Sequence, residues 1–209
     1  FSAMMVEPVV KSIEFDEAAL KKVAEHLGYG YKYGNLVELT KLIKFFNSQE
    51  GDRIEVRVPE FFGISSATIK GILNGQGFDI EKQWKEVVDV LSAEEKAETL
   101  RTKQVPQKFW KKQQEFIKNL EDAFGRLSGD NPFQLKEGEL ATLSALFNAL
   151  RDKLMVRSTG KEDTRKLANA GGNESIANVE PTMAAVVAAA KRVVRSYFEE
   201  KSLMQRLGL

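Results

Sequence analysis

The sequence predicts a mostly helical protein, a bundle of several helices in one or two subdomains, with at most a short strand near residues 54–58. Apolar residues recur at spacings of three and four along most of the chain, as they do on one face of an α-helix. Several of these runs begin with a capping residue and end at glycine or proline. The alternation of polar and apolar residues that is typical of a strand is clearest at residues 54–58.

Composition indicates a globular protein and excludes several kinds of site. The 209 residues are 43% hydrophobic and 29% charged, which is enough for a large buried core. Lys and Arg number 31 against 30 Asp and Glu, so any basic surface must be local. The absence of cysteine excludes disulfides, thiolate metal sites and cysteine nucleophiles. No apolar run approaches the roughly 18 residues of a membrane span, so we expect no membrane partner and a cytoplasmic or other intracellular location, or a virion.

The N-terminal part is predicted to contain two helices. We interpret residues 1–4 as an expression remnant and expect the first helix over residues 16–28. The Gly/Tyr run at 28–34 is either a turn whose rings pack on a helix or, if extended, a platform of tyrosines on which bases could stack. Asn35 and Glu38 have the spacing of a capping box. They predict a helix with an apolar face made of Leu36, Leu39, Leu42, Ile43 and Phe46.

Residues 58–74, VPEFFGISSATIKGILN, have the spacing of a helix-turn-helix. Gly63 allows the sharp turn, and Ser65 is a suitable N-cap for a second helix that begins at Ser66. The segments Gly63-Ile64-Ser65, Ala67-Thr68-Ile69 and Leu73-Asn74 resemble the helix-turn-helix of LacI-type repressors. This resemblance implies that exposed residues of the second helix contact bases or phosphates, namely Ser66, Thr68 and Lys70.

The same segment has a simpler interpretation that needs no nucleic acid. Residues 54–58 would form a short strand, Pro59 would end it, and residues 66–73 would form an ordinary amphipathic helix. Pro59 favours this interpretation, because proline inside a helix costs about 3 kcal/mol. Both interpretations stay open at the level of sequence.

The rest of the chain is predicted to be helical and to continue in a C-terminal bundle. Asp79 caps a helix to about residue 91, and the capping box of Ser92 and Glu95 opens a charged helix over 92–105. This charged helix would link an N-terminal part, residues 5–91, to a bundle at 106–209. Further helices are expected at 106–129, 138–154 and 181–199.

Basic residues gather in two places within the predicted bundle. The segment 151–166 resembles a flexible loop and contains Arg151, Arg157, Lys161, Arg165 and Lys166. The helix at 181–199 has a second patch made of Lys191, Arg192 and Arg195. Both could neutralise phosphates. The small apolar residues of helix 181–199, together with the tail 202–209, are predicted to join subunits of a homo-oligomer.

The motifs of common catalytic and metal sites are missing from the sequence. The one histidine, His26, lies near the end of a predicted helix and is interpreted as a cap or surface residue. Gly160 and Lys161 do not form a P-loop, because Met155 stands where the first glycine is needed and Glu162 where Ser or Thr binds magnesium. We therefore expect no enzyme, no cofactor, no metal and no catalytic residue.

Three functional hypotheses follow from these patterns. The first is a non-enzymatic nucleic-acid-binding protein that uses residues 58–74 and the basic loops. The second is a self-assembling coat or nucleocapsid protein that packages RNA or DNA through the loop 151–166. The third is a helical adaptor that binds no nucleic acid. A near-neutral total charge is compatible with assembly, because strongly charged subunits repel each other.

Overall fold

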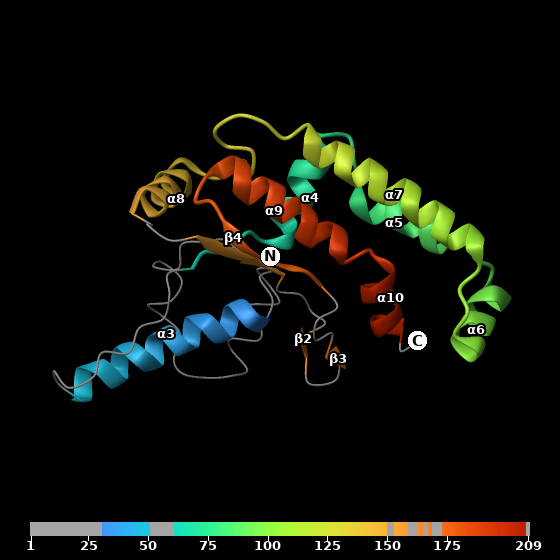
Figure 1. Ribbon diagram of the computed structural model, residues 1–209, viewed down its shortest axis with the longest axis horizontal. Coiled ribbons are helices and arrows are strands. Elements are labelled where there is room, and N and C mark those ends of the chain that lie inside the picture. The colour runs from blue at the N-terminus through green and yellow to red at the C-terminus, as the bar shows by residue number, and fades with distance from the viewer. Residues whose placement is uncertain are drawn as a thin grey trace. The chain divides into compact units, whose positions relative to one another are not determined.

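The computed structural model describes residues 31–50, 61–149, 153–158, 163–164, 167–168 and 173–207, and it confirms the predicted mostly helical class. These ranges contain eight helices and four short strands (Figure 1). The chain forms two compact units, Phe1–Ala67 with Thr159–Ala168 and Thr68–Ser158 with Asn169–Leu209. None of the helices in the described ranges has the length and apolar composition needed to cross a membrane. The helix expected at 16–28 and the strand expected at 54–58 lie outside the described residues.

The first unit is built around helix α3 (Tyr31–Glu50). Tyr33 and Val37 are buried, and the Tyr33 ring meets Phe61 edge-on with 5.6 Å between centroids. The short strands β2 (Asp163–Thr164) and β3 (Leu167–Ala168) pair antiparallel in the same unit. Since α3 begins at Tyr31, Asn35 lies inside the helix rather than capping it, which corrects the predicted helix start. Tyr31 and Tyr33 are helical, so they adopt neither the turn nor the extended conformation considered for the Gly/Tyr run.

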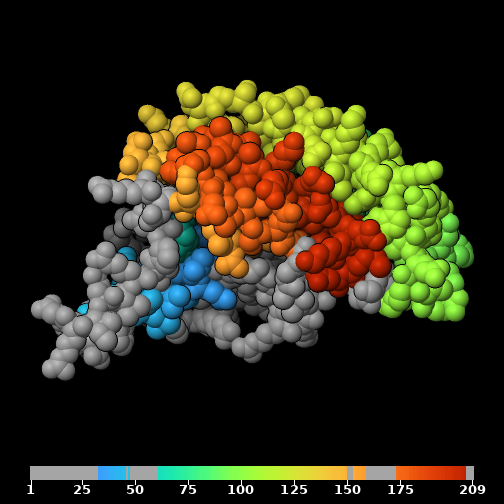
Figure 2. Space-filling model, viewed as in Figure 1, coloured from blue at the N-terminus to red at the C-terminus, as the bar shows by residue number. Residues whose placement is uncertain are grey.

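The second unit contains the remaining helices and a two-stranded ribbon. Its helices are α4 (Ser66–Gly75, entering from the first unit), α5 (Ile80–Val88), α6 (Ala93–Thr102), α7 (Gln107–Gly125), α8 (Glu137–Ala149), α9 (Met183–Ser196) and α10 (Glu200–Leu207). Helix α7 packs against α5 and α9, and α9 packs against the ribbon of β1 (Leu154–Arg157) and β4 (Ser175–Val179). Figure 2 shows the red atoms of α9 and α10 beside the yellow-green atoms of α7.

An aromatic cluster forms the centre of the second unit. The Trp84 ring lies 5.1 Å from Phe116 and 4.8 Å from Phe198, and Phe116 lies 4.8 Å from Phe198, all centroid to centroid. Such tilted and edge-to-face pairs are worth about 0.5–1.5 kcal/mol beyond the area that they bury. Helix α7 contributes an apolar face to this core, since Phe109, Phe116, Leu120 and Phe124 are all buried.

Capping residues define several helix ends as the sequence predicts. The Asp79 carboxylate accepts hydrogen bonds from the backbone N–H of Glu81 and Lys82 at 3.1 and 3.0 Å. Ser92 and Glu95 form the reciprocal capping box of α6. Each such cap stabilises its helix by about 1 kcal/mol, because it satisfies backbone donors that have no partner within the helix.

The ribbon corrects the predicted organisation of residues 138–178. Helix α8 ends at Ala149, and Leu154, expected to continue its apolar seam, begins β1 instead. Residues 175–179, which lie between two predicted helices, form β4. The two strands pair antiparallel although they are far apart in sequence. Pairing with a distant segment decides their conformation, and local apolar spacing does not contain that information.

Candidate nucleic-acid interface

The β1–β4 ribbon has one face toward α9 and one face toward solvent. Leu154 and Val156 are half-buried, whereas Met155 and Arg157 are exposed. This alternation is expected for a strand with one covered face, because successive side chains point to opposite sides. Arg157 lies opposite Ser175 at the end of the ribbon. No carboxylate in the described ranges pairs with the exposed Arg157 guanidinium.

A β-bulge interrupts the ribbon one step from Arg157. Leu154 pairs with Val179 and Val156 with Ile176, so Ala177 and Asn178 together lie opposite Met155. Asn178 has φ of 58°, the left-handed conformation that asparagine tolerates better than most residues. Bulges increase the local twist and change the direction of side chains. Sequence analysis missed Met155 and Asn178 as surface residues of this face. The alternation in Leu154–Arg157 was the available signal.

The basic segment predicted at 151–166 includes strand β1 of this ribbon. The structure places Arg157 at the exposed end of β1, whereas Arg151, Lys161, Arg165 and Lys166 lie outside the described residues. Arg165 and Lys166 are the two residues between the paired strands β2 and β3. The predicted flexible loop is therefore in part strand, since residues 154–157, 163–164 and 167–168 are all extended and paired.

The three residues predicted to contact nucleic acid through a helix-turn-helix all lie on helix α4. Helix α4 begins at Ser66, as predicted, with Ser66 exposed and Thr68 and Lys70 half-buried. The Lys70 ammonium forms an ion pair with Glu81 of α5. Residues 61–65 are not helical, and residues 51–60, which would supply most of the first helix, lie outside the described residues. Both interpretations of this segment predict helix α4, and the Lys70 side chain of this helix already contacts a carboxylate.

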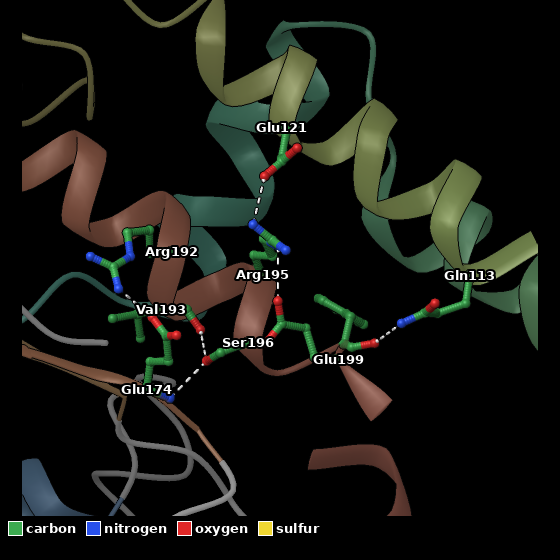
Figure 3. A network of polar contacts seen from close by, with 9 residues as sticks. Gln113, Glu121, Glu174, Arg192, Val193, Arg195, Ser196 and Glu199 are labelled. Atoms are coloured by element: carbon green, nitrogen blue, oxygen red, sulfur yellow. Dashed lines mark hydrogen bonds and ion pairs between the residues drawn. The ribbon is translucent and has the colours of Figure 1, made fainter. Parts of the chain in front are cut away.

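The predicted basic patch on α9 belongs to a network of ion pairs and hydrogen bonds (Figure 3). The Arg192 guanidinium lies 3.1 Å from the Glu174 carboxylate. Arg195 reaches Glu121 of α7 at 3.2 Å, and its Nε lies 2.9 Å from Glu199 Oε1 without the alignment of a hydrogen bond. Lys191 is half-buried and has no carboxylate partner within the described ranges.

Buried polar groups complete this network and were not singled out by sequence analysis. The Ser196 hydroxyl donates to the Val193 carbonyl at 2.8 Å and accepts the backbone N–H of Glu174 at 2.9 Å. Gln113 Nε2 donates to the Phe198 carbonyl at 2.8 Å. These hydrogen bonds join α7, the end of α9 and the residue before β4. The ion pairs of Arg192 and Arg195 connect the same parts of the second unit, so both arginines have a structural role.

Within the described ranges, the groups with a shifted pKa are in surface ion pairs or, for Glu94, at the N-terminus of α6, where hydrogen bonds from its own backbone N–H and from Ser92 lower the pKa. A hydrogen bond from Lys85 lowers the pKa of Asp89, and the same contact raises the pKa of Lys85. A hydrogen bond from Lys108 is the largest cause that lowers the pKa of Glu95. These pairs lie at the protein surface, where ion pairs contribute little to stability. Across the described ranges, no three His, Cys, Asp or Glu side chains form a group that could hold a metal ion, and His26 lies outside those ranges.

The candidate interface that remains in the described part of the second unit is the exposed face of the ribbon, with Arg157 at its end. Among the predicted cations that the structure describes, Lys70, Arg192 and Arg195 already contact carboxylates. Comparison of the chain with protein-family models, with curated proteins and with solved structures finds no match.

Proposed function

We propose that this protein binds the phosphate backbone of nucleic acid, without regard to sequence, through the β1–β4 ribbon and its basic connection. The observation that carries the proposal is the antiparallel pairing of β1 with β4. This pairing brings together the two ends of the segment 158–174, whose sequence contains Lys161, Arg165 and Lys166, and Arg157 is exposed at one of these ends. Two-stranded ribbons are one of the shapes that enter the grooves of duplex DNA.

The ion pairs on α4 and α9 support the ribbon over the helices as the binding element. Lys70 and Arg192 would have to leave Glu81 and Glu174 before they could contact a phosphate, and the released carboxylates would then repel it. Arg157 has no such competitor in the described part of the chain. Sequence-independent binding is expected because phosphate contacts position a protein without distinguishing bases.

The test is a variant in which Arg157, Lys161, Arg165 and Lys166 are replaced by glutamine. For duplex DNA the slope of log affinity against log salt falls by about 0.9 for each phosphate that the protein no longer neutralises, so the four changes should reduce it by roughly 3–4. The measurement is fluorescence anisotropy with labelled duplexes of unrelated sequence, titrated at several salt concentrations. Wild-type affinities should differ little between the duplexes.

A control variant separates the ribbon from total charge. The control uses four exposed lysines on helices α5 and α7 and before α8, namely Lys82, Lys111, Lys118 and Lys136. Their replacement by glutamine changes the net charge by the same amount as the ribbon variant does. The control should leave the salt slope close to that of wild type. An equal reduction in both variants, or none in the ribbon variant, would refute the ribbon as the binding element.

A coat-type function, in which many copies package one nucleic acid, is the second candidate. It needs a contact between subunits in addition to the ribbon, and an exposed apolar face on α3 favours it. The test is gel filtration with absorbance at 260 and 280 nm, before and after nuclease treatment. A large species that nuclease converts to a small one supports packaging, whereas a small species free of nucleic acid contradicts it.

A further inference from the structure

The methionines of this chain differ in how far their side chains are exposed. The sequence has five methionines and no cysteine, so thioethers are the only sulfur groups that a peroxide can oxidise. Three of the five lie in the described ranges, namely Met155, Met183 and Met204. Met155 in β1 is 60% exposed, whereas Met183 in α9 and Met204 in α10 are half-buried. A peroxide must reach the sulfur atom, so Met155 is the most accessible of these three to an oxidant.

The pairing of the ribbon keeps Met155 on the surface. Leu154 and Val156 are half-buried on the side of α9, and successive side chains of a strand point to opposite sides, so Met155 points away from that helix. Across the ribbon, the bulge places Ala177 and Asn178 opposite Met155, and both of these residues are exposed. The exposure of the thioether therefore follows from strand pairing.

Met155 shares the outward face of β1 with Arg157. Residues two apart on a strand line the same face, with about 6.6 Å between their Cα atoms. Both side chains are long, so an oxygen atom on the Met155 sulfur can come within hydrogen-bond distance of the Arg157 guanidinium. A thioether sulfur is only a weak acceptor. A sulfoxide oxygen carries a partial negative charge and accepts strongly, and a hydrogen bond from a guanidinium is charge-assisted.

We propose that Met155 is a site of reversible oxidation by peroxides, and that the sulfoxide formed there binds the guanidinium of Arg157. The sulfur lone pair attacks the terminal oxygen of the peroxide, and the O–O bond breaks as the S–O bond forms. The proton on the transferred oxygen moves to the other oxygen, which leaves as water or an alcohol. Sulfur is oxidised by two electrons and the peroxide is reduced by two.

Oxidation should weaken the phosphate binding proposed above, and this consequence rests on that proposed function. An Arg157 guanidinium that is bound to the sulfoxide oxygen no longer neutralises a phosphate. The slope of log affinity against log salt should then fall by about 0.9 for duplex DNA. Enzymes that reduce methionine sulfoxide regenerate the thioether, so the change should be reversible.

Peptide mapping by mass spectrometry tests the site of oxidation. The protein is exposed to dilute hydrogen peroxide for increasing times, the reaction is stopped with catalase, and the chain is digested. Met155 should be oxidised at least about threefold faster than Met183 and Met204, since exposure governs access to the sulfur. In concentrated urea the three rates should become similar, because unfolding exposes all three side chains. Equal rates in the folded protein, or a preference for Met155 that persists in urea, would overturn the proposal.

The contact with Arg157 is tested without nucleic acid by the NMR signal of the Arg157 Nε–H group, assigned by its loss in Arg157→Gln. Peroxide should shift this signal in the wild type, and methionine sulfoxide reductases should return it to its first position. In the matched control Met155→Leu the signal should be the same before and after peroxide, because leucine is not oxidised. A signal that does not move on oxidation of Met155 would refute the contact.

Anisotropy with a labelled duplex then separates this proposal from the proposed function. A salt slope that peroxide reduces by about 0.9 in the wild type, and not in Met155→Leu, supports both. Binding with a slope that oxidation leaves unchanged contradicts the sulfoxide contact alone. If the unoxidised protein binds no duplex, the proposed function is wrong, and the peptide map and the NMR signal still decide the oxidation site and its contact.

Discussion

Replacing Gln113 by leucine should destabilise the second unit by about 2 kcal/mol. Gln113 is only 5% exposed, and its Nε2 donates to the Phe198 carbonyl at 2.8 Å. Leucine keeps most of the volume but removes the donor, so a buried carbonyl loses its partner at a cost of about 1–3 kcal/mol. With a urea dependence of roughly 2 kcal/mol per molar, the unfolding midpoint should fall by about 1 M.

Tryptophan fluorescence is the appropriate probe for this measurement. The protein has two tryptophans, Trp84 and Trp110, both in the second unit, and Trp84 packs directly on Phe198. The neighbouring Gln114 is exposed, so Gln114→Leu is the control and should change stability by no more than about 0.5 kcal/mol. If the two variants have the same midpoint, the buried hydrogen bond does not stabilise the unit and the reasoning is refuted.

Two further predictions concern a cap and the bulge. Hydrogen bonds from Lys108 and from the Ser92 backbone lower the pKa of Glu95 from its ordinary 4.5. The ionised carboxylate therefore stabilises the fold above pH 4.5, and this contribution disappears as the pH falls through the lowered pKa. Urea titrations should therefore show Glu95→Gln less stable than wild type at neutral pH and equal to it in acid; a constant difference would contradict this. Asn178→Val should lower the free energy of unfolding by about 1–2 kcal/mol, since a β-branched residue tolerates a positive φ poorly. Asn178→Gly is the control and should not lower it. Equal destabilisation by the two variants would mean that φ is not the cause.

Local signals were sufficient for most helices of the second unit. Asp79 and Ser92 begin α5 and α6 where the capping pattern places them, because a cap depends only on residues within one turn. Helix α9 begins at Met183 with Thr182 as its N-cap, close to the predicted start at residue 181. The end of α7 was less predictable: the helix stops at Gly125, before the glycine expected to end it.

Contacts between distant residues could not be predicted in the same way. Residues 154–157 and 175–179 are too short for apolar spacing to distinguish strand from helix, and each needs the other as its partner. Periodicity also identified an apolar face on α3 without showing that the helix instead buries Tyr33 and Val37. The ion pair of Lys70 with Glu81 joins two helices, so sequence alone could not show that this cation is already engaged.

The discontinuous first unit has a consequence for synthesis on the ribosome. Its two pieces, Phe1–Ala67 and Thr159–Ala168, are separated by Thr68–Ser158 of the second unit. At roughly 5–20 residues per second, the ribosome needs on the order of 5 to 20 seconds to make that intervening stretch. During this interval the N-terminal piece has emerged without β2 and β3, so the first unit is completed only when the second is nearly finished. The first unit therefore cannot be produced alone by truncating the chain at one end.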